Sequence, residues 1–126
     1  MMSRALRLCW ILLALMLWLP AQVHASPEKH TGQNGLPVIT LAELPAKARD
    51  TLRTIKQGGH FAYERDGAVF GNYELMLPKQ PRGYYHEYTV KTPGARNRGA
   101  RRIISGEVNE YYYTADHYQT FKQIRE

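Results

Sequence analysis

Cysteine is almost absent from this sequence. The 126 residues include one cysteine, Cys9, which lies in an apolar stretch near the N-terminus. One cysteine cannot form an internal disulfide, so the disulfide-stapled class of small domain is excluded. The sequence also has no internal repeat and no His or Cys spacing typical of a metal site. The stability of the fold therefore has to come from a packed core.

No apolar run in the sequence is long enough to span a membrane. The longest, Leu8–Leu19, is 12 residues, whereas a spanning helix needs about 20 and the core of a signal peptide about 7–15. Arg4 and Arg7 precede the run, and Val23-His24-Ala25 is typical of a signal peptidase site. We therefore expect residues 1–25 to be a cleaved signal peptide, with an uncleaved membrane anchor as the alternative.

Basic residues outnumber acidic ones. The chain has 17 Lys and Arg against 11 Asp and Glu, a formal net charge of +6. Removal of residues 1–25, which hold two arginines and no acid, leaves 15 basic residues and a net charge of +4. This balance favours anionic partners such as RNA, and it also aids solubility. Signal cleavage predicts an extracellular or periplasmic location without stable membrane association, and it removes Cys9.

After residue 25 the chain reads as a tail, a helix and a series of strands. Residues 26–40 are rich in Pro and Gly, lack apolar periodicity and are expected to form a mobile tail. Leu41–Gln57 is the one clear helix, with Pro45 in its first turn and Gly58-Gly59 at its end. An i, i+4, i+8, i+11 pattern predicts its buried stripe: Leu44, Ala48, Leu52 and Ile55.

Strand-like runs separated by short turns follow the helix. The strongest are Tyr84–Lys91 and Arg101–Ser105, with a turn signal at Pro93-Gly94 between them. One helix followed by strands predicts an α+β domain over residues 41–126, in which the helix covers one face of an antiparallel sheet and the other face is an open cleft. The weaker runs are Ala68–Phe70, Leu75–Pro78, Tyr111–Tyr113 and Tyr118–Ile124.

Charged side chains gather in the stretch Tyr84–Glu107. Arginine presents a fork of donors that matches phosphate oxygens, and a carboxylate such as Glu87 beside such cations can accept a proton. Since strand residues alternate between faces, Glu87 and Arg102 are predicted to share a surface that His86 faces away from. A solvated basic face without chemistry is the alternative. Four arginines lie within seven residues: Arg96, Arg98, Arg101 and Arg102.

Three motifs, taken in order, resemble one protein family. YYHEYTV at 84–90, TPGARNRGARRII at 92–104 and YYTADHY at 112–118 look like the guanyl-specific microbial ribonuclease family, its barnase-like bacterial group and above all the ribonuclease Sa type. The resemblance runs from Leu41 to Ile124. It implies the microbial ribonuclease fold and a metal-independent enzyme without cofactor. Relatives of the Sa type carry one disulfide, which this chain lacks.

The resemblance assigns catalytic roles to four residues. Glu87 takes the place of the family's general base and His117 that of its general acid, and histidine is well suited to exchange protons near neutral pH. Arg98 and Arg102 would hold the phosphoryl oxygens. Tyr118, beside His117, is placed in the substrate cleft. A lone histidine is more often structural than catalytic, which is the alternative for His117.

The motif FGNYE implies a second, base-binding site. In the family this loop binds guanine: backbone N–H groups meet the purine O6, and a glutamate accepts from N1 and the exocyclic amine. Glu74 takes that glutamate's place and Asn72 the asparagine's; a surface glutamate in a turn is the alternative. Gly71 and Tyr73 stand where relatives carry a polar residue and often an arginine, so the guanine preference is expected to be weaker. The residues of the motif are Phe70, Gly71, Asn72, Tyr73 and Glu74.

The chain is thus predicted to be a secreted endoribonuclease that cleaves single-stranded RNA after guanosine, through a 2′,3′-cyclic phosphate to a 3′-phosphate. The alternative is a basic RNA-binding module without catalysis, which would not need Glu87 and His117 together. A membrane-tethered interaction protein would follow if the leader were retained. We expect a monomer. Relatives are inhibited by a small acidic protein of the barstar type, and such an inhibitor of this chain would bind at the Arg98–Arg102 surface.

Overall fold

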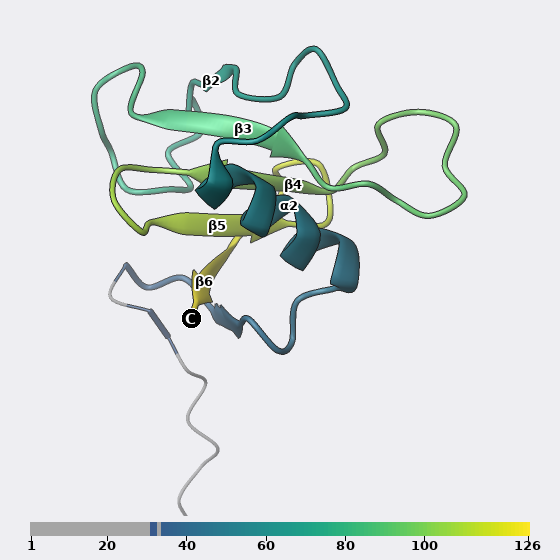
Figure 1. Cartoon of the computed structure of the whole chain (residues 1–126). Helices are drawn as coiled ribbons and strands as arrows, with labels where there is room; N and C mark the ends of the chain where they lie inside the picture. The colour runs from purple at the N-terminus through teal and green to yellow at the C-terminus, as the bar shows by residue number, and fades with distance from the viewer. Residues whose placement is uncertain (1–30, 33) are drawn as a thin grey trace, which may run out of the picture.

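One helix and six strands form the part of the chain that the structure, a computed structural model, describes: residues 31, 32 and 34–126. The helix α2 (Ala46–Gln57) lies across one face of the sheet (Figure 1), which confirms the predicted α+β class. The predicted signal peptide and the first residues of the predicted tail lie outside the described residues. The strands are β1 (Val38–Thr40), β2 (Val69–Phe70), β3 (Tyr85–Thr89), β4 (Arg102–Ser105), β5 (Tyr111–Thr114) and β6 (Lys122–Arg125).

The sheet is mixed, with the strand order β1-β6-β5-β4-β3-β2. Neighbours from β2 to β6 pair antiparallel, as predicted, but β1 pairs parallel with β6, where Ile39 lies opposite Ile124. The expectation of a wholly antiparallel sheet is therefore wrong at this edge. The expectation of a mobile tail through Thr40 is also wrong for its last three residues, which form β1. β1 has only three residues, too few to show an alternating apolar pattern, and its partner β6 lies at the other end of the sequence. The pairing therefore leaves no local signal in the sequence.

The helix begins later than predicted. Pro45 occupies the N-cap position instead of the first turn, and residues 41–44 form a turn before it. The reason is steric, because a residue that precedes proline is pushed out of the helical conformation. Gly58 adopts a left-handed conformation, with φ of 63°, and ends the helix as predicted. Within the described residues no helix has the length and apolar composition to cross a bilayer.

Both faces of the sheet carry a core. In β4 the adjacent residues Ile103 and Ile104 point to opposite sides, and both are fully buried. The face opposite α2 is therefore closed over much of its area, and the cleft is smaller than predicted. The helix-side core confirms the predicted stripe and comprises Ile39, Leu44, Ala48, Leu52, Val90, Ile103, Tyr113 and Ile124, with Ile55 packed against it. The opposite core comprises Leu77, Tyr85, Ile104, Tyr112 and Phe121.

The run Leu75–Pro78, predicted as strand-like, lies in a loop. The side chain of Asn72 takes the place of a strand partner: its Oδ1 accepts from the Leu77 N–H at 3.1 Å, and its Nδ2 donates to the Leu77 carbonyl at 3.0 Å. Leu77 is buried in the core opposite α2. A short apolar run cannot by composition be told from a strand when it fills a core from a loop.

A carboxylate shared by two tyrosines fastens the segment before β1 to the sheet. Glu110 accepts from the hydroxyls of Tyr84 and Tyr112, both at 2.5 Å, and Asn34 donates to the Tyr112 oxygen at 3.3 Å. Burial raises the pKa of Tyr112, and its bond to Glu110 adds to that effect; for Tyr84 the bond to Glu110 is the main cause of a raised pKa. Both phenols therefore stay protonated donors, and a hydrogen-bonded cluster links residue 34 to the β4–β5 hairpin.

Glu110→Ala is expected to lower the free energy of unfolding by about 1.5–3 kcal/mol, because the buried Tyr112 hydroxyl loses a charged acceptor. Urea unfolding followed by circular dichroism measures this. Glu43→Ala, which removes one exposed carboxylate elsewhere, is the matched control and should change the stability by less than about 0.5 kcal/mol. Equal losses in the two variants would show that the cluster contributes nothing specific.

Candidate active site

Glu87 and Arg102 lie on the same face of the sheet, as strand alternation predicts. In the antiparallel pairing of β3 with β4, Glu87 is opposite Ile104 and Thr89 is opposite Arg102. Directly opposed residues point to the same side of a sheet, so these four share the face away from α2. Both charged side chains are buried, with 5% of Glu87 and 2% of Arg102 exposed. Buried charges need partners, and the partners of these two define the site.

Three side chains surround the Glu87 carboxylate. Its Oε1 lies 3.4 Å from Nη2 of Arg98 and 3.5 Å from Nε of Arg65, and its Oε2 accepts from the Tyr118 hydroxyl at 2.6 Å. Arg98 is half-buried and is oriented by a second bond, from its Nε to Thr89 Oγ1 at 3.0 Å. The sequence motifs predicted Arg98 and Tyr118 at this site. They missed Arg65, whose place depends on how the turn around Asp66-Gly67 packs on β3.

Arg102 has a buried donor without a partner. Its Nη1 donates to the carbonyls of Arg101, at 2.8 Å, and Arg98, at 3.4 Å. Its Nε is buried and makes no hydrogen bond within the described residues. An unpaired buried donor costs about 1–3 kcal/mol, and more when it is charged. A bound anion would satisfy this donor, so Arg102 fits a phosphate site better than a purely structural role.

The other candidates from the arginine cluster lie elsewhere. Arg101, the neighbour of Arg102, acts on Tyr113 in the helix-side core: burial raises the pKa of Tyr113, and the Arg101 charge opposes that rise. Arg96 is exposed in the turn before β4. On the helix side too, the His86 ring lies 2.9 Å from the Gly67 carbonyl oxygen. Of the four arginines, Arg98 and Arg102 thus lie on the side of Glu87, whereas Arg101 lies toward the helix side and Arg96 lies in the turn.

His117 projects from a loop that is held in a strained conformation. Both His117 and Tyr118 have left-handed backbones, with φ of 55° and 70°, which is uncommon outside glycine and typical of functional loops. The His117 N–H donates to the Ala100 carbonyl at 3.0 Å, and the Tyr118 N–H donates to Thr114 Oγ1 at 3.1 Å. These bonds fix the exposed imidazole of His117 beside Tyr118, whose hydroxyl donates to the buried carboxylate of Glu87.

Asp116 braces the same loop. Its Oδ1 accepts from the Thr114 hydroxyl and from the Thr120 N–H, both at 2.9 Å. Hydrogen bonds, first the one from the Thr120 hydroxyl and then the one from its N–H, lower the pKa of Asp116 to about 2. The bracing carboxylate is therefore ionised at any pH above about 4, and the loop geometry persists throughout the neutral range.

Tyr118 connects the proposed acid to the proposed base. Its ring centroid lies 4.9 Å from that of His117, and its hydroxyl donates to Glu87. Burial raises the pKa of Tyr118 to about 12, with Glu87 as the second cause, so the phenol stays protonated. The ring also lies 6.0 Å from the Arg102 guanidinium and stacks on Phe70 at 5.1 Å. One side chain thus touches the carboxylate, the cation and the neighbouring pocket.

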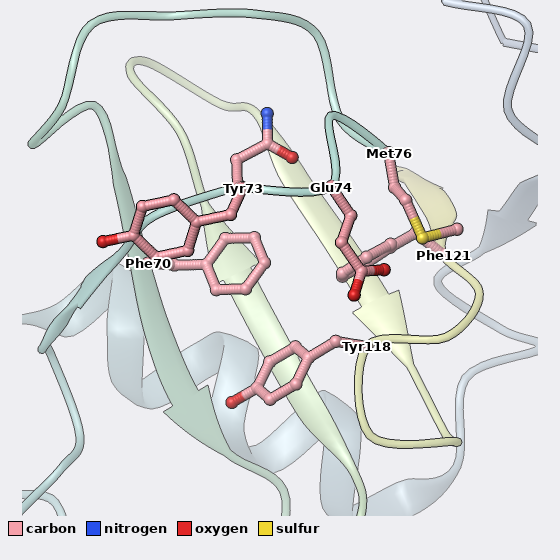
Figure 2. A pocket seen from close by; sticks show the side chains of 7 residues that line it. Phe70, Tyr73, Glu74, Met76, Tyr118 and Phe121 are labelled. Carbon is pink, nitrogen blue, oxygen red and sulfur yellow. The ribbon is translucent and has the colours of Figure 1, made fainter.

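An aromatic pocket adjoins this centre and has a volume of about 180 Å³. Figure 2 shows the Glu74 carboxylate directed into the space beside Phe70, Tyr118 and Phe121. A carboxylate among apolar rings is suited to a flat ligand with two adjacent donors on its edge. Met76 and Phe121 were not predicted here, because neither carries a sequence signal beyond its apolar character. The lining residues are Phe70, Asn72, Tyr73, Glu74, Met76, Tyr118 and Phe121.

The two departures in the FGNYE loop, Gly71 and Tyr73, lie in contact with each other. A side chain at Gly71 would place its Cβ 2.4 Å from the Tyr73 ring, so the ring could keep this position only beside a glycine and would otherwise have to shift. Tyr73 is 83% exposed, and its hydroxyl accepts from Arg82 at 2.7 Å. Gly71 therefore makes room for Tyr73, which the sequence alone did not indicate. Asn72 borders the pocket, but its amide is bonded back to Leu77 and holds the loop in shape.

Metal-ligating side chains do not gather at this centre. Among residues 31, 32 and 34–126, no group of three or more His, Cys, Asp or Glu is arranged to hold a metal ion. The charges that surround Glu87 are guanidinium groups, supplied by Arg65 and Arg98 with Arg102 nearby on the same face.

Comparison with known proteins identifies the family. A family model described as ribonuclease matches residues 26–125. Guanyl-specific ribonuclease Sa of Kitasatospora aureofaciens is 59% identical over 87 residues, which is 68% of this chain and 91% of that protein. Guanyl-specific ribonuclease St of Saccharopolyspora erythraea is 51% identical over 89 residues, 71% of this chain and 88% of that protein.

Solved structures agree with these matches. Ribonuclease Sa2, in a structure of its complexes with mononucleotides, superposes with a TM-score of 0.71 at 47% identity over 72% of this chain and 95% of that chain. Ribonuclease Sa2 with guanosine-2′-cyclophosphate gives a TM-score of 0.69 at 48% identity over 71% and 96%. The family match and these identities, together with the cations around a buried carboxylate, establish that this chain belongs to the ribonuclease family of enzymes.

Proposed function

We propose that this protein is a guanyl-preferring endoribonuclease that cleaves single-stranded RNA. The observation that carries the proposal is the buried carboxylate of Glu87 among guanidinium groups, next to a pocket that contains Glu74. The relatives Sa and St are named guanyl-specific, and Sa2 is known with mononucleotides. A simple RNA-binding module would gain nothing from a carboxylate in the middle of its cations, because that carboxylate repels phosphate.

The reaction begins with proton transfer to Glu87. The carboxylate takes the proton of the ribose 2′-hydroxyl, and the 2′-oxygen attacks the adjacent phosphorus. Arg98 and Arg102 hold the phosphoryl oxygens as negative charge grows, which is electrostatic stabilisation of the transition state. The unused Nε of Arg102 gains an acceptor in this step. His117 donates a proton to the departing 5′-oxygen, so every proton has a donor and an acceptor.

The first product is a 2′,3′-cyclic phosphate, which water opens to a 3′-phosphate with the roles of His117 and Glu87 exchanged. The nucleophile is the substrate's own 2′-hydroxyl, and the arginines supply the positive charge, so the proposed reaction requires neither a metal nor a cofactor. DNA lacks that hydroxyl, so it is not a substrate.

Base choice depends on Glu74. Guanine presents two donors side by side, N1–H and the exocyclic amine, and a carboxylate has two acceptors that can meet them. Adenine carries an acceptor at N1 and therefore cannot match. The aromatic rings of Phe70 and Tyr118 bound the pocket that receives the base. Tyr73 supplies an aromatic ring at the mouth of this pocket where the family often has a cation, so we infer a weaker preference for guanine.

Export and partners complete the proposal. We infer that residues 1–25 direct secretion and that the enzyme acts outside the cytoplasm as a monomer. An acidic protein inhibitor of the barstar type would bind over Arg98 and Arg102, because that surface combines basic charge with the proposed substrate site.

Glu87→Gln and His117→Asn are each expected to lower kcat by about 10²–10⁴-fold, because each removes one partner in proton transfer. Asparagine is chosen at position 117 since it tolerates the left-handed backbone there. Cleavage of a dinucleotide with guanosine on the 5′ side measures the effect, and circular dichroism checks the fold. His60→Asn, an exposed histidine outside the site, should keep wild-type turnover. Wild-type rates in both site variants would refute the mechanism.

Glu74→Ala is expected to reduce cleavage after guanosine by roughly 10- to 1000-fold, because hydrogen bonds to a charged acceptor are worth about 1.5–3 kcal/mol each. Slow cleavage after other bases should change little, since Glu87 and His117 are untouched. Four dinucleotides that differ in the 5′ base provide the measurement. If the wild-type enzyme cleaves all four equally well, the guanine assignment fails while the ribonuclease assignment stands.

A further inference from the structure

We propose that Arg65 is a third arginine that binds the reacting phosphate, an inference that rests on the proposed function. The Nε of Arg65 lies 3.5 Å from Glu87 Oε1, the same oxygen that Arg98 approaches at 3.4 Å. The two guanidinium groups therefore meet at one atom of the proposed base. No sequence motif pointed to Arg65, since it precedes β2 and lies 22 positions before Glu87.

The turn that carries Arg65 is attached to β3 by backbone hydrogen bonds and by the side chain of Asp66. The Gly67 N–H donates to the Glu87 carbonyl at 2.8 Å, and the Glu87 N–H donates to the Ala68 carbonyl at 2.9 Å. Asp66 continues the attachment, because its Oδ1 accepts from the Thr89 N–H at 2.7 Å and its Oδ2 from the Tyr63 N–H at 3.2 Å. The backbone beside Arg65 is thus held in register with Glu87, and its side chain starts from a defined point.

The ion pair between Arg65 and Glu87 contributes little to the stability of the fold. The Arg65 side chain is 64% exposed although Glu87 is buried, so solvent screens this pair on the Arg65 side and limits what it adds to stability. Glu87 also has two more deeply placed partners, Arg98 and Tyr118. The Arg65 side chain forms no other ion pair or hydrogen bond within the described residues, so the four N–H donors on its two Nη atoms are free for a ligand.

The chemistry of the substrate places the phosphate within reach of those donors. The 2′-oxygen that contacts Glu87 is separated from the reacting phosphorus only by the ribose C2′–C3′ bond and the 3′-oxygen, so the phosphate lies beside the carboxylate. Arg102, with its buried and unpaired Nε, would then contact the phosphate from the protein side, and the exposed Arg65 would contact it from the solvent side. A guanidinium fork on each side matches the oxygens of one phosphate. Arg65 thus closes the open side of the charge cluster.

The test compares Arg65→Gln, Arg65→Lys and a matched control, Arg53→Gln. Arg53 is 65% exposed and pairs with Asp50 at 3.4 Å on α2, so it loses the same charge and a similar ion pair away from the site. Two quantities are measured: kcat/KM for a dinucleotide with guanosine on the 5′ side, and the inhibition constant of inorganic phosphate against that cleavage. A dinucleotide carries a single phosphate, so only contacts to the reacting group are reported.

Arg65→Gln should lower kcat/KM about 10- to 100-fold and raise the inhibition constant of phosphate by a similar factor. Arg65→Lys should recover part of both, because it restores the charge without the fork. Arg53→Gln should match the wild type in both. Wild-type values for Arg65→Gln would overturn the inference, and so would a loss of activity with an unchanged phosphate inhibition constant. A wild-type protein that cleaves no RNA would instead refute the proposed function.

Discussion

The register between β3 and β4 is the constraint on which the rest of the site depends. Because Thr89 lies opposite Arg102 and Glu87 opposite Ile104, a carboxylate and a guanidinium share one face of the sheet. A slip of one residue would move Arg102 to the helix side and put Arg101 in its place. The register is held by burial on both faces, where Ile103 and Ile104 each fill a core. The hydrophobic core thus positions the charges.

Burying these charges has a cost that the structure only partly offsets. Glu87 is surrounded by donors, but Arg102 keeps a buried Nε without a partner. A site of this kind is more stable with an anion bound than without one, since a phosphate completes the hydrogen bonds of the guanidinium. In the reaction that we propose, the same unsatisfied donor would act on the charge that develops at phosphorus. The unpaired Nε of Arg102 thus lowers the stability of the site and is also the donor available to a phosphate.

The parts of the structure that follow from local pattern could be predicted from sequence. Alternation placed Glu87 with Arg102, and the helical stripe placed Leu52 in the core. The family resemblance added His117, whose position depends on a strained loop that no propensity indicates. Contacts between distant segments could not be predicted. Strand β1 pairs with the far end of the chain, and Arg65 reaches Glu87 only because a turn is hydrogen-bonded to β3.

The central claim is that the alternation of β4 separates a phosphate-binding arginine from a structural one. Arg102→Lys and Arg101→Lys test it most directly, because both keep the charge and each loses one guanidinium. Turnover of a dinucleotide with guanosine on the 5′ side should fall about 10- to 100-fold in Arg102→Lys, which loses the Nε donor, and stay near wild type in Arg101→Lys. Equal losses, or a larger loss in Arg101→Lys, would contradict the account.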